Sequence, residues 1–181
     1  MGKITLVTGG VRSGKSRCAL SYAQSKDGNK MFIATAVPFD DEMRIRVKNH
    51  RLERGELFET VEEPYELAAA IAHVHSRYSI TVVDCLTVWM GNLFYKYEQN
   101  PGQISAEIDK LIKALSGVQS EIIMVTNEVG WGIVPENKLA REFRDMNGLL
   151  NQKVAAVADN VILSVCGIQI NIKGNGLQHV N

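Results

Sequence analysis

One stretch near the start of the chain constrains the fold more than any other. Residues 9–16 read Gly-Gly-Val-Arg-Ser-Gly-Lys-Ser, which fits the pattern G-x-x-x-x-G-K-[ST]. An apolar run, Ile4 to Thr8, precedes it, and a stretch with helical periodicity, Ser16 to Ser25, follows. A glycine-rich loop between a strand and a helix can turn backbone N–H groups toward phosphate oxygens. The sequence therefore predicts a phosphate-binding loop, in which Lys15 contacts the β- and γ-phosphates and Ser16 binds Mg²⁺.

The rest of the chain alternates short apolar runs with stretches of helical period. The runs predicted as buried strands are Ile4–Thr8, Met31–Thr35, Ile80–Asp84, Ile122–Thr126 and Val161–Val165. The stretches predicted as helices are Ser16–Ser25, Asp41–Arg54, Tyr65–His75, Leu86–Tyr97, Ser105–Leu115 and Glu136–Ala158. A turn at Gly167 and a last run, Ile168 to Ile172, predict an antiparallel edge strand. The alternation indicates an α/β fold, with a mostly parallel central sheet flanked by helices.

Chain length, charge and cysteine content limit the number of domains and the classes of function to be expected. The chain has 181 residues, and we expect a single domain over residues 1–173 with a flexible tail at 174–181. Lys and Arg number 20 and so do Asp and Glu, so a nucleic-acid partner is not expected. Three widely spaced cysteines indicate a reducing compartment, and we expect a cytoplasmic protein. No apolar run approaches the roughly 20 residues of a membrane span, so no membrane insertion is expected.

An acidic residue ends one of the predicted strands. Asp84 follows Val82 and Val83, and an aspartate at the end of an apolar strand is typical of a Mg²⁺ ligand in phosphate-loop proteins. The alternative is a structural role, in which Asp84 or Thr87 caps the next helix. The two roles are compatible.

A second candidate site follows the second predicted strand. Acidic residues at 40–42 lead into a basic stretch at 44–54 that contains one histidine, His50. One interpretation is a solvated helix whose charges match its dipole. The other is chemical: a neutral imidazole among cations can attack the α-phosphorus of a nucleotide, while pyrophosphate leaves into the phosphate loop.

A third candidate segment follows the fourth predicted strand. Asn127 and Glu128 come directly after it, and Trp131 lies in the loop that follows. Since ligands bind at the carboxyl ends of parallel strands, Asn127 and Glu128 are candidates to orient a substrate hydroxyl or a water near the γ-phosphate. Trp131 is a candidate surface for a large ligand. The alternative is a loop in which these polar groups only satisfy the backbone.

These motifs together resemble one enzyme family, the bifunctional adenosylcobinamide kinase/adenosylcobinamide-phosphate guanylyltransferases of cobalamin synthesis. The resemblance covers nearly the whole chain. Its marks are Thr8–Ser16, Ile33–Ala36, Asp40–Met43 with Arg46 and His50, Thr60–Glu62, Val83–Thr87, Thr126–Asn137, Leu139–Arg141 and Phe143–Asp145. The phosphate loop alone is generic, whereas the block after Thr126 and the spacing from Asp40 to His50 are specific.

The resemblance implies two activities. ATP or GTP phosphorylates adenosylcobinamide; GTP then guanylylates a histidine, and the GMP passes to adenosylcobinamide phosphate. It implies that His50 is the guanylylated residue and that the protein is a homotrimer with a RecA-like sheet. The nucleotide contacts expected from the phosphate loop and from the resemblance are Gly9, Gly10, Val11, Arg12, Ser13, Gly14, Lys15, Ser16, Ala34, Thr35, Ala36, Arg51, Leu52, Glu53, Arg54, Glu62 and Asp84.

Two other functions compete with this interpretation. One is a small-molecule kinase with a single activity, in which His50 is only a phosphate contact. The other is a nucleotide-dependent switch. Turnover of a small acceptor would exclude the switch, and an acid-labile nucleotide adduct on the protein would exclude the plain kinase.

Overall fold

The computed structural model describes residues 2–38, 55–74 and 76–177. Within these ranges the strands form one seven-stranded sheet in the order β3-β2-β4-β5-β1-β6-β7. The strands are β1 (Ile4–Thr8), β2 (Lys30–Ala34), β3 (Glu59–Glu62), β4 (Ile80–Asp84), β5 (Glu121–Val125), β6 (Asn160–Val165) and β7 (Ile168–Lys173). All neighbouring pairs are parallel except β6 and β7, which are antiparallel. The predicted fold class is confirmed.

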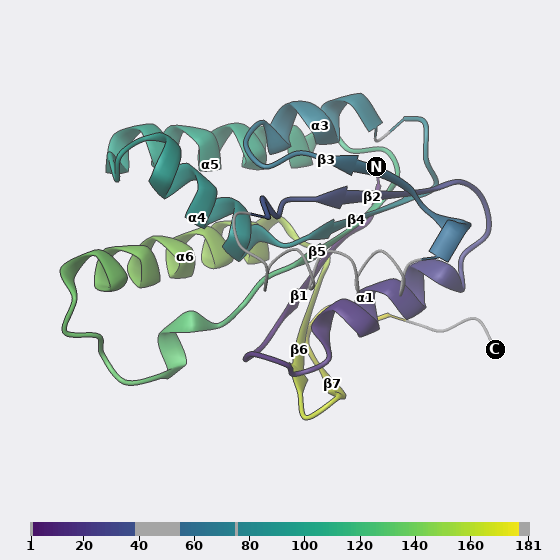
Figure 1. Ribbon diagram of the computed structural model, residues 1–181. Coiled ribbons are helices and arrows are strands. Elements are labelled where there is room, and N and C mark those ends of the chain that lie inside the picture. The colour runs from purple at the N-terminus through teal and green to yellow at the C-terminus, as the bar shows by residue number, and fades with distance from the viewer. Residues whose placement is uncertain (1, 39–54, 75, 178–181) are drawn as a thin grey trace.

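Helices cover both faces of the sheet. The helices are α1 (Lys15–Gln24), α3 (Leu67–Val74), α4 (Leu86–Lys96), α5 (Pro101–Ser116) and α6 (Lys138–Val157), with short 3₁₀ turns η1 (Gly55–Leu57) and η2 (Val129–Trp131). Figure 1 shows α3, α4, α5 and α6 on one side of the sheet and α1 on the other. The chain therefore folds as three layers, with the sheet in the middle.

The core consists of two apolar clusters, one on each face of the sheet. Successive residues of a strand point to opposite faces, so Ile122 and Met124 join the cluster under α3 to α6. Ile123 and Val125 join the cluster under α1. Strands buried on both faces explain why the central runs of the sequence are continuously apolar rather than alternating.

Most predicted elements occur within a few residues of their expected bounds, and the helix starts differ for an identifiable reason. Helix α5 begins a turn early, at Pro101, because the Asn100 Oδ1 accepts hydrogen bonds from two backbone N–H groups, at 3.1 and 3.2 Å. Helix α6 begins at Lys138 rather than Glu136, because Asn137 caps it through Ala140 N at 3.1 Å. The helix expected over residues 41–54 lies outside the described residues.

Strand β3 was not predicted. Its four residues, Glu59 to Glu62, are all exposed, and Val61 is the one apolar residue among them, so the segment lacks the continuous apolar run that marks a buried strand. The strand pairs with β2 at the edge of the sheet, with Ala34 opposite Glu62. This pairing brings Glu62 next to the carboxyl ends of β2 and β4.

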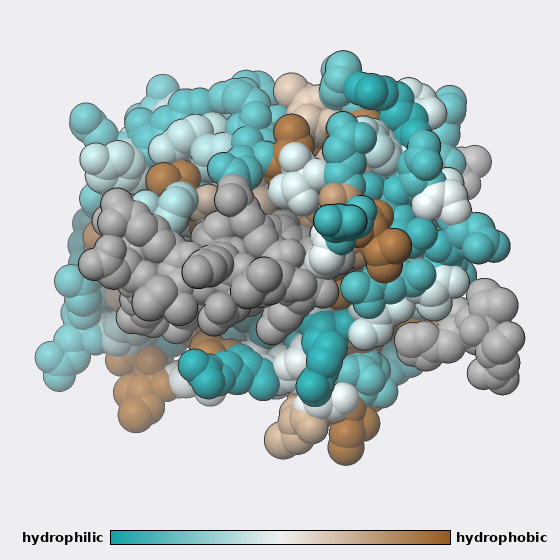
Figure 2. All heavy atoms as spheres, turned by 45° about the vertical axis from the view of Figure 1, so that its right-hand side comes forward, coloured by the Kyte–Doolittle hydropathy of each residue, from teal (hydrophilic) through white to brown (hydrophobic). Residues whose placement is uncertain are grey.

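The described part of the C-terminal segment packs against the domain. Gly176 N donates to the Asn160 Oδ1 at 3.1 Å, and Leu177 packs against the cluster under α1. Residues 178–181 lie outside the described residues. On the face in Figure 2, hydrophobic side chains appear in several separate places rather than as one broad patch. Among the described helices, none is both long and apolar enough to cross a membrane.

Candidate active site

The loop from Gly9 to Ser16 has the backbone of a phosphate cradle. Gly9 and Gly14 have φ angles of +146° and +97°, which other residues rarely adopt. A Cβ on Gly9 would also lie 2.2 Å from the Ser164 carbonyl oxygen. Gly14 is the N-cap of α1 and provides no side chain to cap it, so the N–H groups of the first turn have no side-chain capping partner. This end of α1 suits an anion.

Lys15 is already held at the loop. Its Nζ donates to the Gly10 carbonyl oxygen at 2.5 Å and lies 3.4 Å from the Ser13 Oγ. Burial lowers the pKa of Lys15, and the nearby Cys85, Asp84 and Glu128 act in the opposite direction. The acidic side chains at neighbouring strand ends thus lie close enough to influence the lysine of the loop.

The end of β6 and the turn between β6 and β7 are hydrogen-bonded to the phosphate loop. The Ser13 carbonyl oxygen accepts two hydrogen bonds, from the Ser164 Oγ at 2.7 Å and from Gly167 N at 2.9 Å. Ser164 is fully buried. These contacts fix the peptide that precedes Gly14. Sequence reasoning missed this support, because only the tertiary fold brings residues 13 and 164 together.

Asp84 ends β4 and does not cap the next helix. Residue Cys85 is the N-cap of α4, and its Sγ accepts from Val88 N at 3.4 Å. Thr87 does not cap the helix either, because its Oγ1 contacts Asn127 N at 2.8 Å. The capping alternative for both residues is therefore wrong. Burial, followed by the charge of Asp84, raises the pKa of Cys85 to about 12.

Three of the expected nucleotide contacts lie in one row across the strand ends. Ala34 is opposite Glu62 on one side and Asp84 on the other. Neighbouring strands are about 4.8 Å apart, so these three residues lie side by side at the carboxyl ends of β3, β2 and β4. The next residue, Thr35, is buried, and its Oγ1 pairs with both the N and the O of Cys85 at 2.8 Å. Its side chain therefore joins β2 to β4 at this edge.

A polar network lies beside the phosphate loop, at the end of β5. The Glu128 Oε1 accepts from the Thr8 Oγ1 at 2.5 Å and from the Asn151 Nδ2 at 3.2 Å. The Asn151 Oδ1 accepts from the Thr126 Oγ1 at 2.7 Å. Sequence reasoning identified Glu128 but missed Asn151 on α6. The signal was available, because Asn147 and Asn151 are four residues apart on the buried face of that helix.

Several expected site residues fall outside the described residues, namely His50, Arg51, Leu52, Glu53 and Arg54. Trp131, in η2, is described and is 66% exposed. The loop after it is held to α6, because the Arg141 guanidinium donates to the carbonyl oxygens of Pro135 and Glu136 at 3.0 and 2.5 Å.

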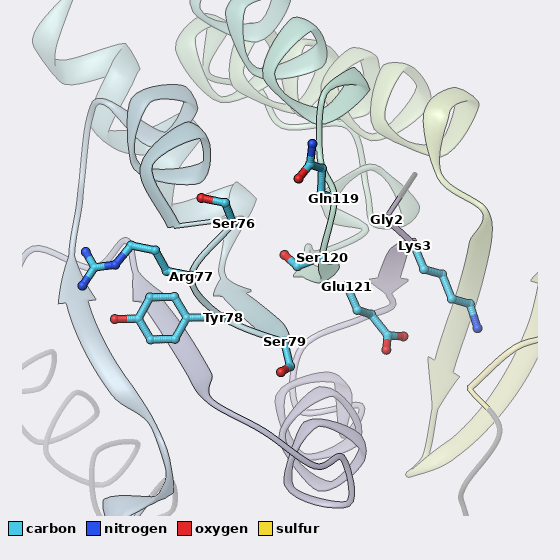
Figure 3. Close-up of a pocket in the computed structure, with 9 residues that line it drawn as sticks. All are labelled: Gly2, Lys3, Ser76, Arg77, Tyr78, Ser79, Gln119, Ser120 and Glu121. Atoms are coloured by element: carbon cyan, nitrogen blue, oxygen red, sulfur yellow. The ribbon is translucent and has the colours of Figure 1, made fainter.

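A separate pocket of about 560 Å³ lies at the opposite ends of the strands, where β1, β4 and β5 begin (Figure 3). Its lining is Gly2, Lys3, Ser76, Arg77, Tyr78, Ser79, Gln119, Ser120 and Glu121. It is distant from the phosphate loop, since the loop lies at the carboxyl end of β1. None of the expected site residues lines it.

The geometry of the loop and of the neighbouring strand ends defines a class of protein. A glycine loop between β1 and α1, a buried lysine and an aspartate at the end of a nearby parallel strand are the features of a P-loop nucleotide-binding protein. The chain belongs to the cobinamide kinase / cobinamide phosphate guanyltransferase family, whose sequence model matches residues 5–172.

Curated relatives match over nearly their full length. The bifunctional adenosylcobalamin biosynthesis protein CobU of Escherichia coli (strain K12) is 40% identical over 182 residues, covering 93% of this chain and 98% of that protein. The corresponding protein CobP of Pseudomonas aeruginosa is 37% identical over 172 residues, covering 95% and 98%.

Solved structures share the fold. The RadB recombinase matches with a TM-score of 0.57 at 16% identity, over 98% of this chain and 84% of that one. A Pyrococcus horikoshii OT3 protein, PH0250, matches with a TM-score of 0.59 at 8% identity, over 98% and 90%. At these identities the likeness concerns the fold alone.

Proposed function

We propose that this protein catalyses two successive reactions of cobalamin biosynthesis. In the first, the γ-phosphoryl group of ATP or GTP moves to the hydroxyl of adenosylcobinamide. In the second, GMP from GTP moves to adenosylcobinamide phosphate, giving adenosylcobinamide-GDP and pyrophosphate. The observation that carries the proposal is the family match over residues 5–172, which includes the complete phosphate loop.

The second reaction is proposed to pass through a guanylylated His50. The chemistry requires a nucleophile that attacks the α-phosphorus while pyrophosphate leaves. The phosphate loop, with Lys15 held at 2.5 Å from the Gly10 carbonyl oxygen, suits the leaving group. His50 is supported by its place in the sequence, among cations that would keep an imidazole neutral.

We propose that Mg²⁺ binds at Ser16 and Asp84. Both offer hard oxygen donors, and Mg²⁺ is commonly held by one or two carboxylates together with substrate phosphates. The effect of Asp84 on the pKa of Lys15 supports its closeness to the loop. When bound, the ion would neutralise charge on the phosphates. The remaining nucleotide contacts are proposed at residues 9–16, 34–36 and 51–54 and at Glu62.

Two further features are proposed for the assembled protein. We propose a homotrimer of about 60 kDa, three times the 20.0 kDa of the chain. We also propose a cytoplasmic location, supported by three cysteines that are all free.

Labelled GTP tests the function directly. Wild type and His50→Ala are incubated with Mg²⁺ and GTP labelled in the α-phosphate or in the γ-phosphate, and label is sought on the denatured protein. We expect α-label on the wild type alone, and no γ-label on either. The same two proteins are assayed for γ-transfer to adenosylcobinamide, which His50→Ala should retain.

Other outcomes distinguish the alternatives. Phosphorylation of adenosylcobinamide without any protein-bound label would contradict the covalent step and favour the kinase with a single activity. Nucleotide binding with neither transfer would favour a nucleotide-dependent switch.

A further inference from the structure

We propose that Glu128 accepts the proton of the substrate hydroxyl during γ-phosphoryl transfer and has no such role in nucleotidyl transfer. This inference rests on the proposed function, because it assigns a residue to one of the two reactions. Strand β5 lies between β1 and β4, so Glu128 stands between the phosphate loop and Asp84.

The backbone and the side chain of Glu128 are both tied to the start of the loop. Glu128 N donates to the Gly9 carbonyl oxygen at 3.1 Å, and the Thr8 Oγ1 donates to its Oε1 at 2.5 Å. Its charge also acts on Lys15, in the direction that keeps the lysine protonated. The carboxylate is therefore beside the place where the γ-phosphate of a bound nucleotide would lie.

One oxygen of this carboxylate is available. Oε1 receives the hydrogen bonds from Thr8 and Asn151, whereas Oε2 receives none from the described residues. No ion pair within 4.0 Å joins Glu128 to a cation in that part of the chain. The side chain is only partly buried, so Oε2 keeps its lone pairs for a substrate hydroxyl.

Buried asparagines fix the carboxylate in this orientation. Asn151 donates to the Asn127 carbonyl oxygen at 3.2 Å as well as to Glu128, and its Oδ1 receives the Thr126 hydroxyl. Asn147 donates to the same Asn127 oxygen at 3.0 Å. Both asparagines are at least nine-tenths buried. Asn151 uses both its Oδ1 and its Nδ2 in these bonds, which holds its amide in one orientation, whereas the Asn147 Oδ1 has no partner among the described residues. Asn151 is thus a positioning residue for Glu128.

The two reactions differ in whether a proton must leave. In γ-transfer the hydroxyl oxygen forms a bond to the γ-phosphorus, and the bond from that phosphorus to the β–γ bridging oxygen breaks. The electron pair leaves with the nucleoside diphosphate, and the hydroxyl proton passes to the Glu128 Oε2 and then to water.

Nucleotidyl transfer needs no such acceptor. A neutral imidazole attacks through a nitrogen that carries no proton, and pyrophosphate takes the electron pair of the broken bond. In the last step an oxygen of the acceptor phosphate forms a bond to the α-phosphorus, the bond from that phosphorus to the imidazole nitrogen breaks, and the imidazole takes the electron pair. The acceptor is a phosphate monoester, whose second pKa of about 6 leaves it ionised at neutral pH without a base. A base beside the γ-phosphate therefore serves the kinase reaction alone.

Glu128→Gln tests this division of labour, because the amide oxygen can still accept from Thr8 and Asn151 while the basicity is lost. Both reactions are measured on the purified full-length chain, together with the Kd for GTP. We expect the kcat of adenosylcobinamide phosphorylation to fall about 100-fold or more. Labelling by α-labelled GTP and the Kd should stay within roughly threefold of wild type.

The matched control is Glu142→Gln on α6, whose carboxylate makes a surface ion pair with Lys138 at 3.4 Å and no other ion pair with the residues that the structure describes. It should leave both reactions unchanged. A parallel loss of both reactions in Glu128→Gln would overturn the inference and assign Glu128 to the support of the loop. Unchanged phosphorylation would overturn it as well. A wild type that is labelled by GTP but never phosphorylates adenosylcobinamide would instead refute the kinase half of the proposed function, and the inference with it.

Discussion

Burial shifts the pKa values of two side chains at the candidate site in opposite directions. Desolvation lowers the pKa of Lys15 and raises that of the Cys85 thiol, because burial disfavours the charged form of each group. The acidic groups nearby favour the cation of Lys15 and oppose the thiolate of Cys85. At neutral pH the site therefore holds a protonated thiol, which serves as a helix cap rather than as a nucleophile.

Cys85 should make the folded protein sensitive to alkali. The thiol has a pKa of 9.0 in an ordinary environment and about 12 in the folded chain. The unfolded chain therefore loses this proton first, so stability falls as pH rises from about 9 to about 12. Cys85→Ala should be less stable than wild type at pH 8, by about 1–2 kcal/mol, through the lost cap and packing. The difference in the free energy of unfolding between wild type and Cys85→Ala should be smaller at pH 10.

Urea unfolding at the two pH values measures the difference. Other groups that titrate in alkali act on both proteins and cancel in the comparison. A gap that stays constant or widens between pH 8 and pH 10 would contradict the raised pKa of Cys85.

At the scale of elements, the β6–β7 hairpin acts as a support for the phosphate loop. Ser164→Ala removes one of the two hydrogen bonds to the Ser13 carbonyl oxygen. The loss of one such bond costs about 1 kcal/mol. Because the bond is also present without nucleotide, only the part that keeps the loop in its binding conformation appears as lost affinity, so we expect GTP affinity to fall by up to about fivefold, by calorimetric titration. Under the proposed function both reactions use this loop, so we expect both to weaken together.

Ser116→Ala is the control for this change. Its hydroxyl also donates to a backbone carbonyl, that of Lys113 at 2.7 Å, but at an exposed helix end away from the site. It should leave the affinity for GTP unchanged. If Ser164→Ala also bound GTP as tightly as wild type, the hairpin would have no part in shaping the cradle.

The same elements show what could be predicted from sequence. The phosphate loop and the five buried strands were predictable, because a local motif and continuous apolar runs report them directly. The exposed strand β3 has no such signal. The contact of Ser164 with the loop spans 151 residues, so local spacing cannot reveal it. The spacing of Asn147 and Asn151 marks a polar helix face, but it does not show that Asn151 contacts Glu128, 23 residues away. The residues around His50 lie outside the described part, and their role stays a prediction.

At the scale of the whole molecule, nucleotide binding should stabilise the fold. A ligand that binds only the folded state, at 100 times its Kd, contributes about 2.7 kcal/mol. For a domain of this size that corresponds to a rise in Tm of roughly 5–10 °C. Thermal unfolding of wild type with GTP and Mg²⁺ should show this shift, and Lys15→Ala at the same concentrations should not. An equal shift in both proteins would place the binding site elsewhere.

The order of the strands also bears on how the protein is made. Strand β1 is the first to be synthesised, but both of its partners in the sheet come much later, β5 at Glu121–Val125 and β6 at Asn160–Val165. During translation the phosphate loop therefore emerges long before any strand can flank it, and the hairpin beneath it arrives last. Nascent chains lacking residues beyond 160 should have no finished cradle. We therefore expect a nascent chain to capture nucleotide only after strands β5 and β6 have been synthesised.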